Sequence, residues 1–195
     1  MRKILLTLGL VLTPAVAFAH TGGGEASGFL HGFGHPVGGL DHVLAMVGVG
    51  ILAFVLGGRA LWLVPAAFVA MMVVGFALGI NLVDLPMVEL GIALSIVVIG
   101  GAAALGRSLP LGLAMALVGV FAIFHGHAHG TEMPANSGGL TYALGFVLAT
   151  ALLHAAGVLA SLAAARAIGR HGQMVARAAG GLFAVGGLGV LSGWL

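Results

Sequence analysis

Long apolar segments separated by short polar ones run along most of the chain. The arrangement predicts an all-α, polytopic membrane protein with six transmembrane helices, because each segment approaches the roughly 20 residues that a helix needs to cross a bilayer. The predicted spans are Leu40–Leu56, Ala60–Ile80, Pro86–Leu105, Leu109–His127, Gly139–Ala165 and Met174–Leu195. Composition agrees, since only 6% of the residues are charged against about 25% in soluble domains.

The N-terminus has the pattern of an export signal. Two basic residues precede the short apolar segment Ile4–Leu12, and Ala17-Phe18-Ala19 matches an A-x-A cleavage site. We expect a signal peptide over residues 1–19 and one six-helix transmembrane domain over residues 20–195. A first transmembrane helix is the alternative, but the apolar core is too short to span about 30 Å. Cleavage would leave His20 either as a metal chelator through its amine and imidazole or as a plain polar residue in the tail.

The arginines indicate how the spans are oriented. After the predicted cleavage site they fall in alternate loops or just beyond them, at Arg59, Arg107, Arg166, Arg170 and Arg177. Basic residues collect on the cytoplasmic side of a membrane. We therefore expect a multi-pass protein of the bacterial inner (cytoplasmic) membrane whose mature N-terminus and C-terminus are both periplasmic.

Two histidine motifs then lie at the same, outer face. The first is HGFGHPVGGLDHVLAM, from His31 to Met46, and the second is FHGHAHGTE, from Phe124 to Glu132. Ionisable residues inside a membrane are costly and mark functional sites by default, and imidazole suits Zn, Cu, Fe and Ni. The absence of cysteine excludes thiolate ligands. The motifs predict a metal site from His35, Asp41, His42, His125, His127, His129 and Glu132.

Several details of this site stay open from sequence. On a regular helix His125 and His129 share a face and His127 does not, unless the neighbouring glycines unwind the helix end and turn all three inward. Asp41 is either a ligand or an outer-shell partner of a ligating histidine. Glu89 is a further ligand or only a cap of its helix. His154, near the middle of the fifth span, is a deeper station or a hydrogen-bonded packing residue.

Glycine spacing and charge balance complete the picture. Gly75-x-x-x-Gly79 and Gly189-x-x-x-Gly193 predict close approach of helices. The sequence pI of about 10.0 comes without any basic run that could follow phosphates, so nucleic acid is not an expected partner. The expected partners are a divalent metal ion and the lipid bilayer, and assembly into a homo-oligomer remains open.

Together the motifs resemble the HupE/UreJ family over essentially the whole chain. The pattern H-P-x-x-G-x-D-H falls on His35, Pro36, Gly39, Asp41 and His42, and the second motif falls on His125, Ala128, His129, Gly130, Glu132 and Pro134. The resemblance implies a secondary nickel or cobalt permease associated with hydrogenase and urease gene clusters. The residues by themselves indicate only an outward-facing site for a divalent transition metal.

The expected activity is therefore transport rather than catalysis, with no resident cofactor. Imidazole must be neutral to bind metal, so uptake should weaken below the usual histidine pKa of about 6.5. One alternative is a membrane metalloenzyme with Glu89 or Glu132 as general base, although the chain contains no H-E-x-x-H. The other is a metal sensor or a delivery protein for hydrogenase or urease, against which the short loops argue.

Overall fold

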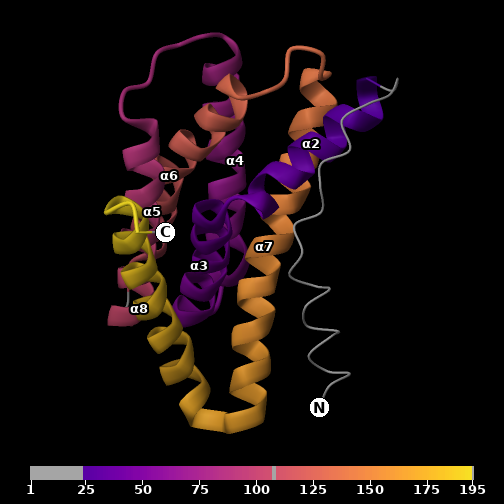
Figure 1. The fold of residues 1–195 in the computed structure, drawn as a ribbon. Helices are drawn as coiled ribbons and strands as arrows, with labels where there is room; N and C mark the ends of the chain where they lie inside the picture. The colour runs from indigo at the N-terminus through magenta and orange to yellow at the C-terminus, as the bar shows by residue number, and fades with distance from the viewer. Residues whose placement is uncertain (1–23, 107–108, 195) are drawn as a thin grey trace, which may run out of the picture.

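The fold is all-helical over the part of the chain that the structure describes. A computed structural model describes residues 24–106 and 109–194, and these contain helices and no strand. The helices are α2 (Gly24–Gly38), α3 (Leu40–Leu56), α4 (Ala60–Ile80), α5 (Val88–Leu105), α6 (Leu111–Thr131), α7 (Gly139–Ile168), a 3₁₀ turn (Gly169–His171) and α8 (Gly172–Leu191) (Figure 1). The predicted signal peptide and His20 lie outside the described residues.

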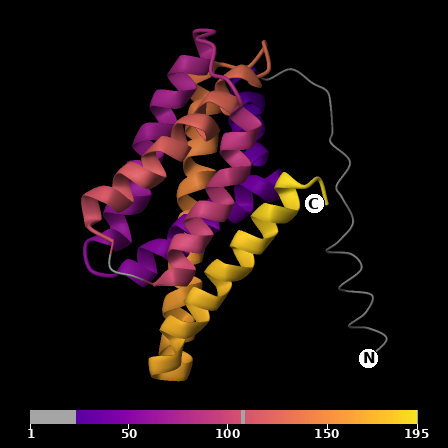
Figure 2. The ribbon, with the colours of Figure 1, turned by 90° about the vertical axis from the view of Figure 1, so that its left-hand side faces the viewer.

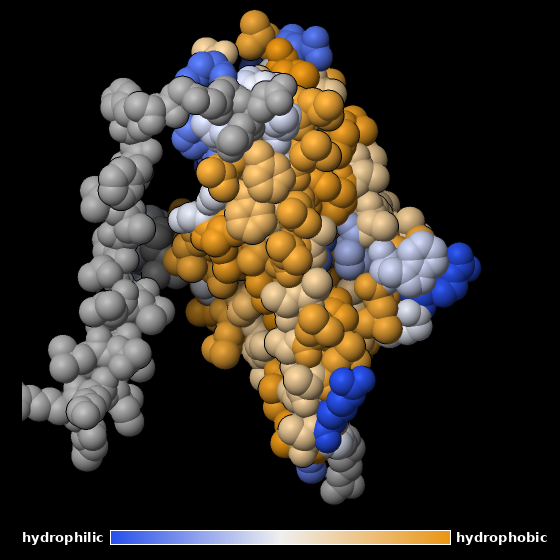
Figure 3. Space-filling model, turned by 90° about the vertical axis from the view of Figure 1, so that its right-hand side faces the viewer, coloured by the Kyte–Doolittle hydropathy of each residue, from blue (hydrophilic) through white to orange (hydrophobic). Residues whose placement is uncertain are grey.

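Each of the six predicted spans corresponds to a helix. α4 to α8 are long and apolar enough to cross a membrane, whereas α3 has 17 residues and meets that requirement only together with α2. Ser27–Gly38 and Leu40–Leu56 meet at a bend of 79°. The chain is therefore a multi-pass membrane protein with five such helices, or six if the bent pair is one span. Figure 3 shows apolar residues covering the middle of one face, with hydrophilic residues toward its margins.

The helix α2 departs from the sequence expectation, which treated this segment as a tail. It contains four glycines after its first residue and Pro36 near its end, so local propensity is poor. Its stability comes from α7, along which it lies (Figure 1). The two backbones touch, since a Cβ at Gly32 would collide with the Tyr142 carbonyl and one at Gly145 with the Phe29 carbonyl. Tertiary packing has overridden propensity here.

The helices alternate in direction, so the bundle has two distinct ends (Figures 1 and 2). One end carries the α4–α5 and α6–α7 connections and the N-terminus of α2, whose C-terminus reaches into the bundle (Figure 1); we name it the histidine end, since His129 lies in the last turn of α6 there and His35, in the last turn of α2, packs against it. The other carries the α3–α4 turn with Arg59 and the α7–α8 turn with Arg166. We name that one the arginine end.

The tightest helix pair is α4 with α6. A Cβ at Gly75 would collide with the Ile123 carbonyl, and one at Gly126 with the Met72 carbonyl. The prediction of close packing at Gly75 and Gly79 is thus confirmed. The corresponding prediction at Gly193 is wrong, because this residue follows the end of α8 at a φ of 72° with open space around it. Its glycine allows a left-handed turn rather than a helix contact.

Candidate metal centre

The helix α6 carries its histidines without unwinding. It is regular to Thr131, so His125 and His129 lie one turn apart on one face, and both are fully buried. His127 points toward the α4–α5 connection, where its Nε2 lies 2.8 Å from the Val83 carbonyl oxygen. Of the two alternatives that the sequence left open, the structure therefore has the regular helix, and the glycines do not turn all three rings inward. The glycines are used for close packing against α4 instead.

The break between α2 and α3 brings the first motif together. Gly39 separates the two helices, and across the bend the rings of His35 and His42 lie 5.3 Å apart between centroids. A side chain at Gly39 would not fit, because its Cβ would lie 2.7 Å from Asp41 Oδ1 and 3.2 Å from His42 Nδ1. Glycine here leaves space for Asp41 to approach His42.

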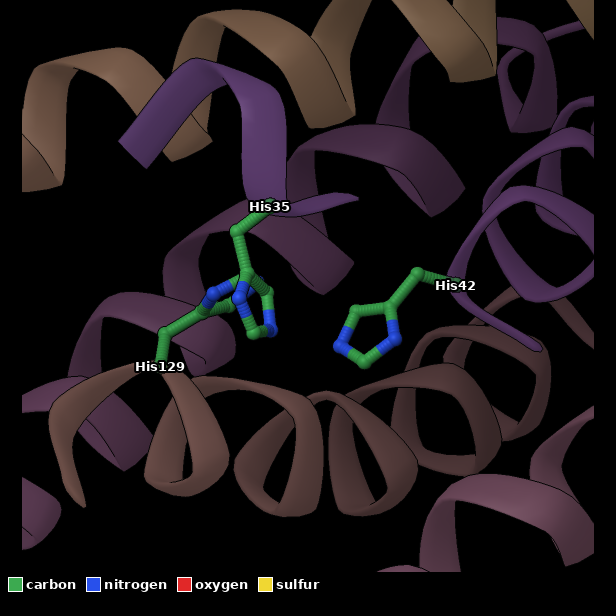
Figure 4. A group of neighbouring side chains, drawn as sticks. All are labelled: His35, His42 and His129. Atoms are coloured by element: carbon green, nitrogen blue, oxygen red, sulfur yellow. The ribbon is translucent and has the colours of Figure 1, made fainter. Parts of the chain in front are cut away.

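Three imidazoles from three helices share one small space (Figure 4). The nearest ring nitrogens of His35, His42 and His129 all lie within 4.8 Å of one another. Two nitrogens bound to one metal at about 2.0–2.1 Å lie at most about 4 Å apart. The three rings therefore need to shift by less than about an ångström to share one ion. We call these residues the imidazole trio.

Asp41 holds one member of the trio by its far nitrogen. Its Oδ1 lies 3.0 Å from His42 Nδ1 and also accepts the backbone N–H of His42 at 2.8 Å. With the proton on Nδ1, the Nε2 lone pair of His42 faces the trio. This contact is the one that an outer-shell carboxylate makes with a ligating histidine.

The buried nitrogens of this region lack protein partners to an unusual degree. His129 Nδ1 and Nε2, His42 Nε2 and His125 Nδ1 are buried without a hydrogen bond among the described residues. A buried polar atom left unpaired costs about 1–3 kcal/mol, and native proteins leave few of them. Several such atoms gathered on facing rings indicate a site that is completed by a ligand.

Carboxylates surround the entrance to the trio. A cavity of about 400 Å³ at the histidine end is lined by Asp41, Glu89 and Glu132, together with His35, His42 and three glycines. Glu132 Oε2 lies 3.2 Å from His35 Nε2. Glu89 stands in the first turn of α5 and is exposed. The donors around this cavity are oxygen and nitrogen atoms, which suits a hydrated divalent cation.

Two of the predicted residues, His125 and His154, lie deeper in the bundle than the trio. His125 continues the trio inward, with its ring centroid 5.0 Å from that of His42 and its Nε2 3.0 Å from Ser95 Oγ. His154 lies in the middle of α7, 2% exposed, with neither ring nitrogen hydrogen-bonded among the described residues. The interhelical hydrogen bond that would make it a packing residue is therefore not formed there.

Sequence reasoning missed several neighbours of these rings. Phe146 stacks on His129, with ring centroids 4.7 Å apart and ring planes at 4° to each other. Ser95 contacts His125. Ser95 carried a detectable signal, since it is the single hydroxyl-bearing residue of α5 and lies within the apolar part of that helix. Phe68 and Phe146 carried none, because an aromatic residue in an apolar span has the pattern of ordinary packing.

The chain is similar to known proteins over nearly its whole length. A family model described as "HupE / UreJ protein" matches residues 8–190. The chain is 47% identical over 192 residues to a protein named "Protein HupE" from Rhizobium leguminosarum bv. viciae, and the match covers 98% of both chains. No solved structure matches the chain.

Proposed function

The chain belongs to the HupE/UreJ family, and we propose that it is a secondary permease for a divalent transition-metal cation, nickel or cobalt. The observation that carries the proposal is the imidazole trio: nitrogens from α2, α3 and α6 face one another, and His42 Nε2 and both ring nitrogens of His129 have no hydrogen-bond partner among the described residues. The cation is the transported substrate rather than a resident cofactor. The proposal contains no catalytic step.

The residues of the histidine end have different roles in binding the cation. Glu89 and Glu132 at the entrance attract the hydrated cation and begin to replace its water. His35, His42 and His129 then ligate it through neutral imidazoles. Asp41 fixes the ring of His42 and offsets part of the charge. A divalent cation bound here forms metal–nitrogen bonds with the buried nitrogens, in place of the hydrogen bonds that they lack.

Direction follows from the membrane placement that the arginines indicate. We propose that the protein lies in the cytoplasmic membrane with the histidine end and both mature termini on the periplasmic side. The membrane potential then favours entry by about 2.3 kcal/mol per charge per 100 mV. This placement also supports a signal peptide over residues 1–19, after whose removal His20 starts the mature chain and offers its amine and imidazole as metal ligands.

Orientation has its own test. A reporter fused after Leu195 should be active in the periplasm, and one inserted within Gly169–Gly172 should be active in the cytoplasm. Intact mass of the purified protein should show His20 as the first residue. A cytoplasmic C-terminus would contradict the placement of the histidine end on the outer side.

The function is tested by reconstituting the purified protein in vesicles. Initial uptake of nickel, cobalt, zinc and copper is compared under an inside-negative potential, beside protein-free vesicles. Nickel or cobalt should enter in a protein-dependent and saturable way. Tight binding without uptake would contradict the permease and favour the metal-delivery alternative.

A further inference from the structure

Four histidine rings, those of His35, His129, His42 and His125, form a series of contacts into the bundle, and Phe68 lies where this series ends. Ring centroids lie 4.8 Å apart for His35 and His129, 5.2 Å for His129 and His42, and 5.0 Å for His42 and His125. The next imidazole inward is His154. Within the described residues no ring contact joins it to His125.

Phe68 contacts both sides of this interruption. Its fully buried ring lies 5.6 Å from the ring of His125 and meets that of His154 edge-on at 5.1 Å. Both imidazoles are buried and each keeps an unpaired nitrogen. A phenyl ring has no lone pair with which to ligate a transition metal, so ligand exchange along the series stops at this side chain.

Two cavities flank the half of α4 that carries Phe68. The half of α4 toward the histidine end is locked to α6, where the backbones meet at Gly75 and Gly79. The half toward the arginine end borders a cavity of about 600 Å³ against α7, lined by Pro65, Val69 and His154 among others. On its α6 side lies a second cavity of about 420 Å³.

Pro65 adds a weak point to this half of the helix. It lies inside α4 and has no N–H to donate to the carbonyl four residues earlier, at Leu61. Helices bend most readily where such a bond is missing. A small bend at Pro65 would move residues 60–64 away from the turn that carries Phe68, which gives its ring space to change rotamer while the glycine contacts beyond it stay in place.

We propose that Phe68 is the inner gate of the metal path. The gate is closed in this structure, and displacement of the Phe68 ring lets a divalent cation exchange its ligands from His125 to His154. The inference rests on the proposed permease function and adds the residue that controls passage. No covalent bond is made or broken, so only metal–ligand bonds and water change.

The gate is tested by asking whether metal reaches position 154. The chain has no cysteine, so His154→Cys introduces a unique thiol that reports cobalt through its thiolate charge-transfer absorption. Protein in vesicles receives external Co²⁺, and the rate at which the band appears is followed. In combination with Phe68→Ala or Phe68→Leu the band should appear about tenfold faster, as for a barrier lowered by about 1.4 kcal/mol. Phe68→Trp should slow it.

Phe183→Ala is the matched control. Phe183 is a partly buried phenylalanine of α8 that packs near Gly48, and its removal should leave the rate unchanged. Phe68→Leu keeps an apolar side chain in place, so its result stands even if Phe68→Ala does not fold. Equal rates with and without the Phe68→Leu substitution, or no band in either background, would overturn the gate.

Failure of the gate and failure of the permease are distinguishable. Cobalt binding at the trio is measured by its visible absorption, and net uptake by an indicator inside the vesicles. Trio binding with no uptake in any variant would refute the permease, while the rate at which the thiolate band appears would still decide whether Phe68 blocks the path. Uptake that is unchanged by Phe68→Trp would refute the gate alone.

Discussion

Both ends of the bundle carry polar side chains, but the two ends differ in whether the hydrogen bonds of those side chains are made within the protein. At the arginine end Arg177 donates to the carbonyls of Ala104 and Leu105, both at 3.0 Å, and Gln173 donates to the Val55 carbonyl at 2.9 Å. These carbonyls are the ones that a helix end leaves without partners. At the histidine end, His42 Nε2 and both ring nitrogens of His129 are buried without a hydrogen-bond partner in the part of the chain that the structure describes.

The difference separates structural polarity from functional polarity. A polar side chain whose hydrogen bonds are all made within the protein stabilises the fold and requires no ligand. Buried donors and acceptors that do not bond to one another destabilise the fold until a ligand binds to them. The following variants test whether the two ends really divide in this way.

The largest effect is expected at the trio. His42→Ala and His129→Ala each remove one of three facing nitrogens, so nickel-dependent uptake should be abolished while the protein still inserts. Uptake at limiting nickel and nickel affinity of the purified variants are the measurements. His171→Ala is the control, since His171 is exposed in the 3₁₀ turn at the arginine end and should have little effect. Parental uptake in either trio variant would refute the shared site.

The next effect is expected at Asp41. Asp41→Asn keeps an acceptor for the His42 Nδ1–H but removes the charge, so metal affinity should fall about 10–100-fold, as for other outer-shell partners of ligating histidines. Calorimetric titration with nickel measures it. A loss as complete as that of His42→Ala would instead make Asp41 a direct ligand.

A packing variant separates fold from ligation at the same end. Gly126→Ala would drive a methyl group into the Met72 carbonyl, and overpacking of this kind costs about 1–3 kcal/mol. The thermal midpoint in detergent should fall. Gly112→Ala in the same helix is the matched control, because its Cβ would meet nothing within 4 Å. Equal midpoints for the two variants would contradict the close α4–α6 contact.

The smallest effect is expected at the arginine end. Arg177→Ala removes two exposed hydrogen bonds to the end of α5, which together stabilise by about 1 kcal/mol. The thermal midpoint should fall slightly, and nickel affinity should stay at the parental value. A loss of affinity comparable to that at the trio would erase the distinction between the two ends.

Much of the fold was predictable from the apolar pattern. The bounds of α3 and α4 are those that the sequence indicates, and the remaining spans differ by several residues at their ends. The helix α2 was not predictable, because its glycines and Pro36 disfavour a helix locally. It is the long-range contact with α7 that stabilises it, and such a contact leaves no periodic pattern in the segment itself.

The candidate site was predictable as a set of residues but not as a geometry. The sequence placed His35, His42 and His129 at one end, and the structure brings them together. It also predicted that His127 leaves the shared face of a regular helix, and this alternative is the one observed. The Asp41–His42 contact was one of two open roles, since it depends on the 79° bend at Gly39, an angle that no local pattern specifies.

The bend at Gly39 has an electrostatic consequence of its own. By ending one helix and starting another beside the trio, it directs the C-terminus of α2 to the place where α6 also ends. Each helix C-terminus carries about half a negative elementary charge from its aligned peptide dipoles. The N-terminus of α3 brings the opposite sign, and Asp41 in its first turn counters it. The carboxylates that line the cavity, Asp41, Glu89 and Glu132, therefore outweigh the positive helix N-termini beside them, and the region attracts cations and repels anions.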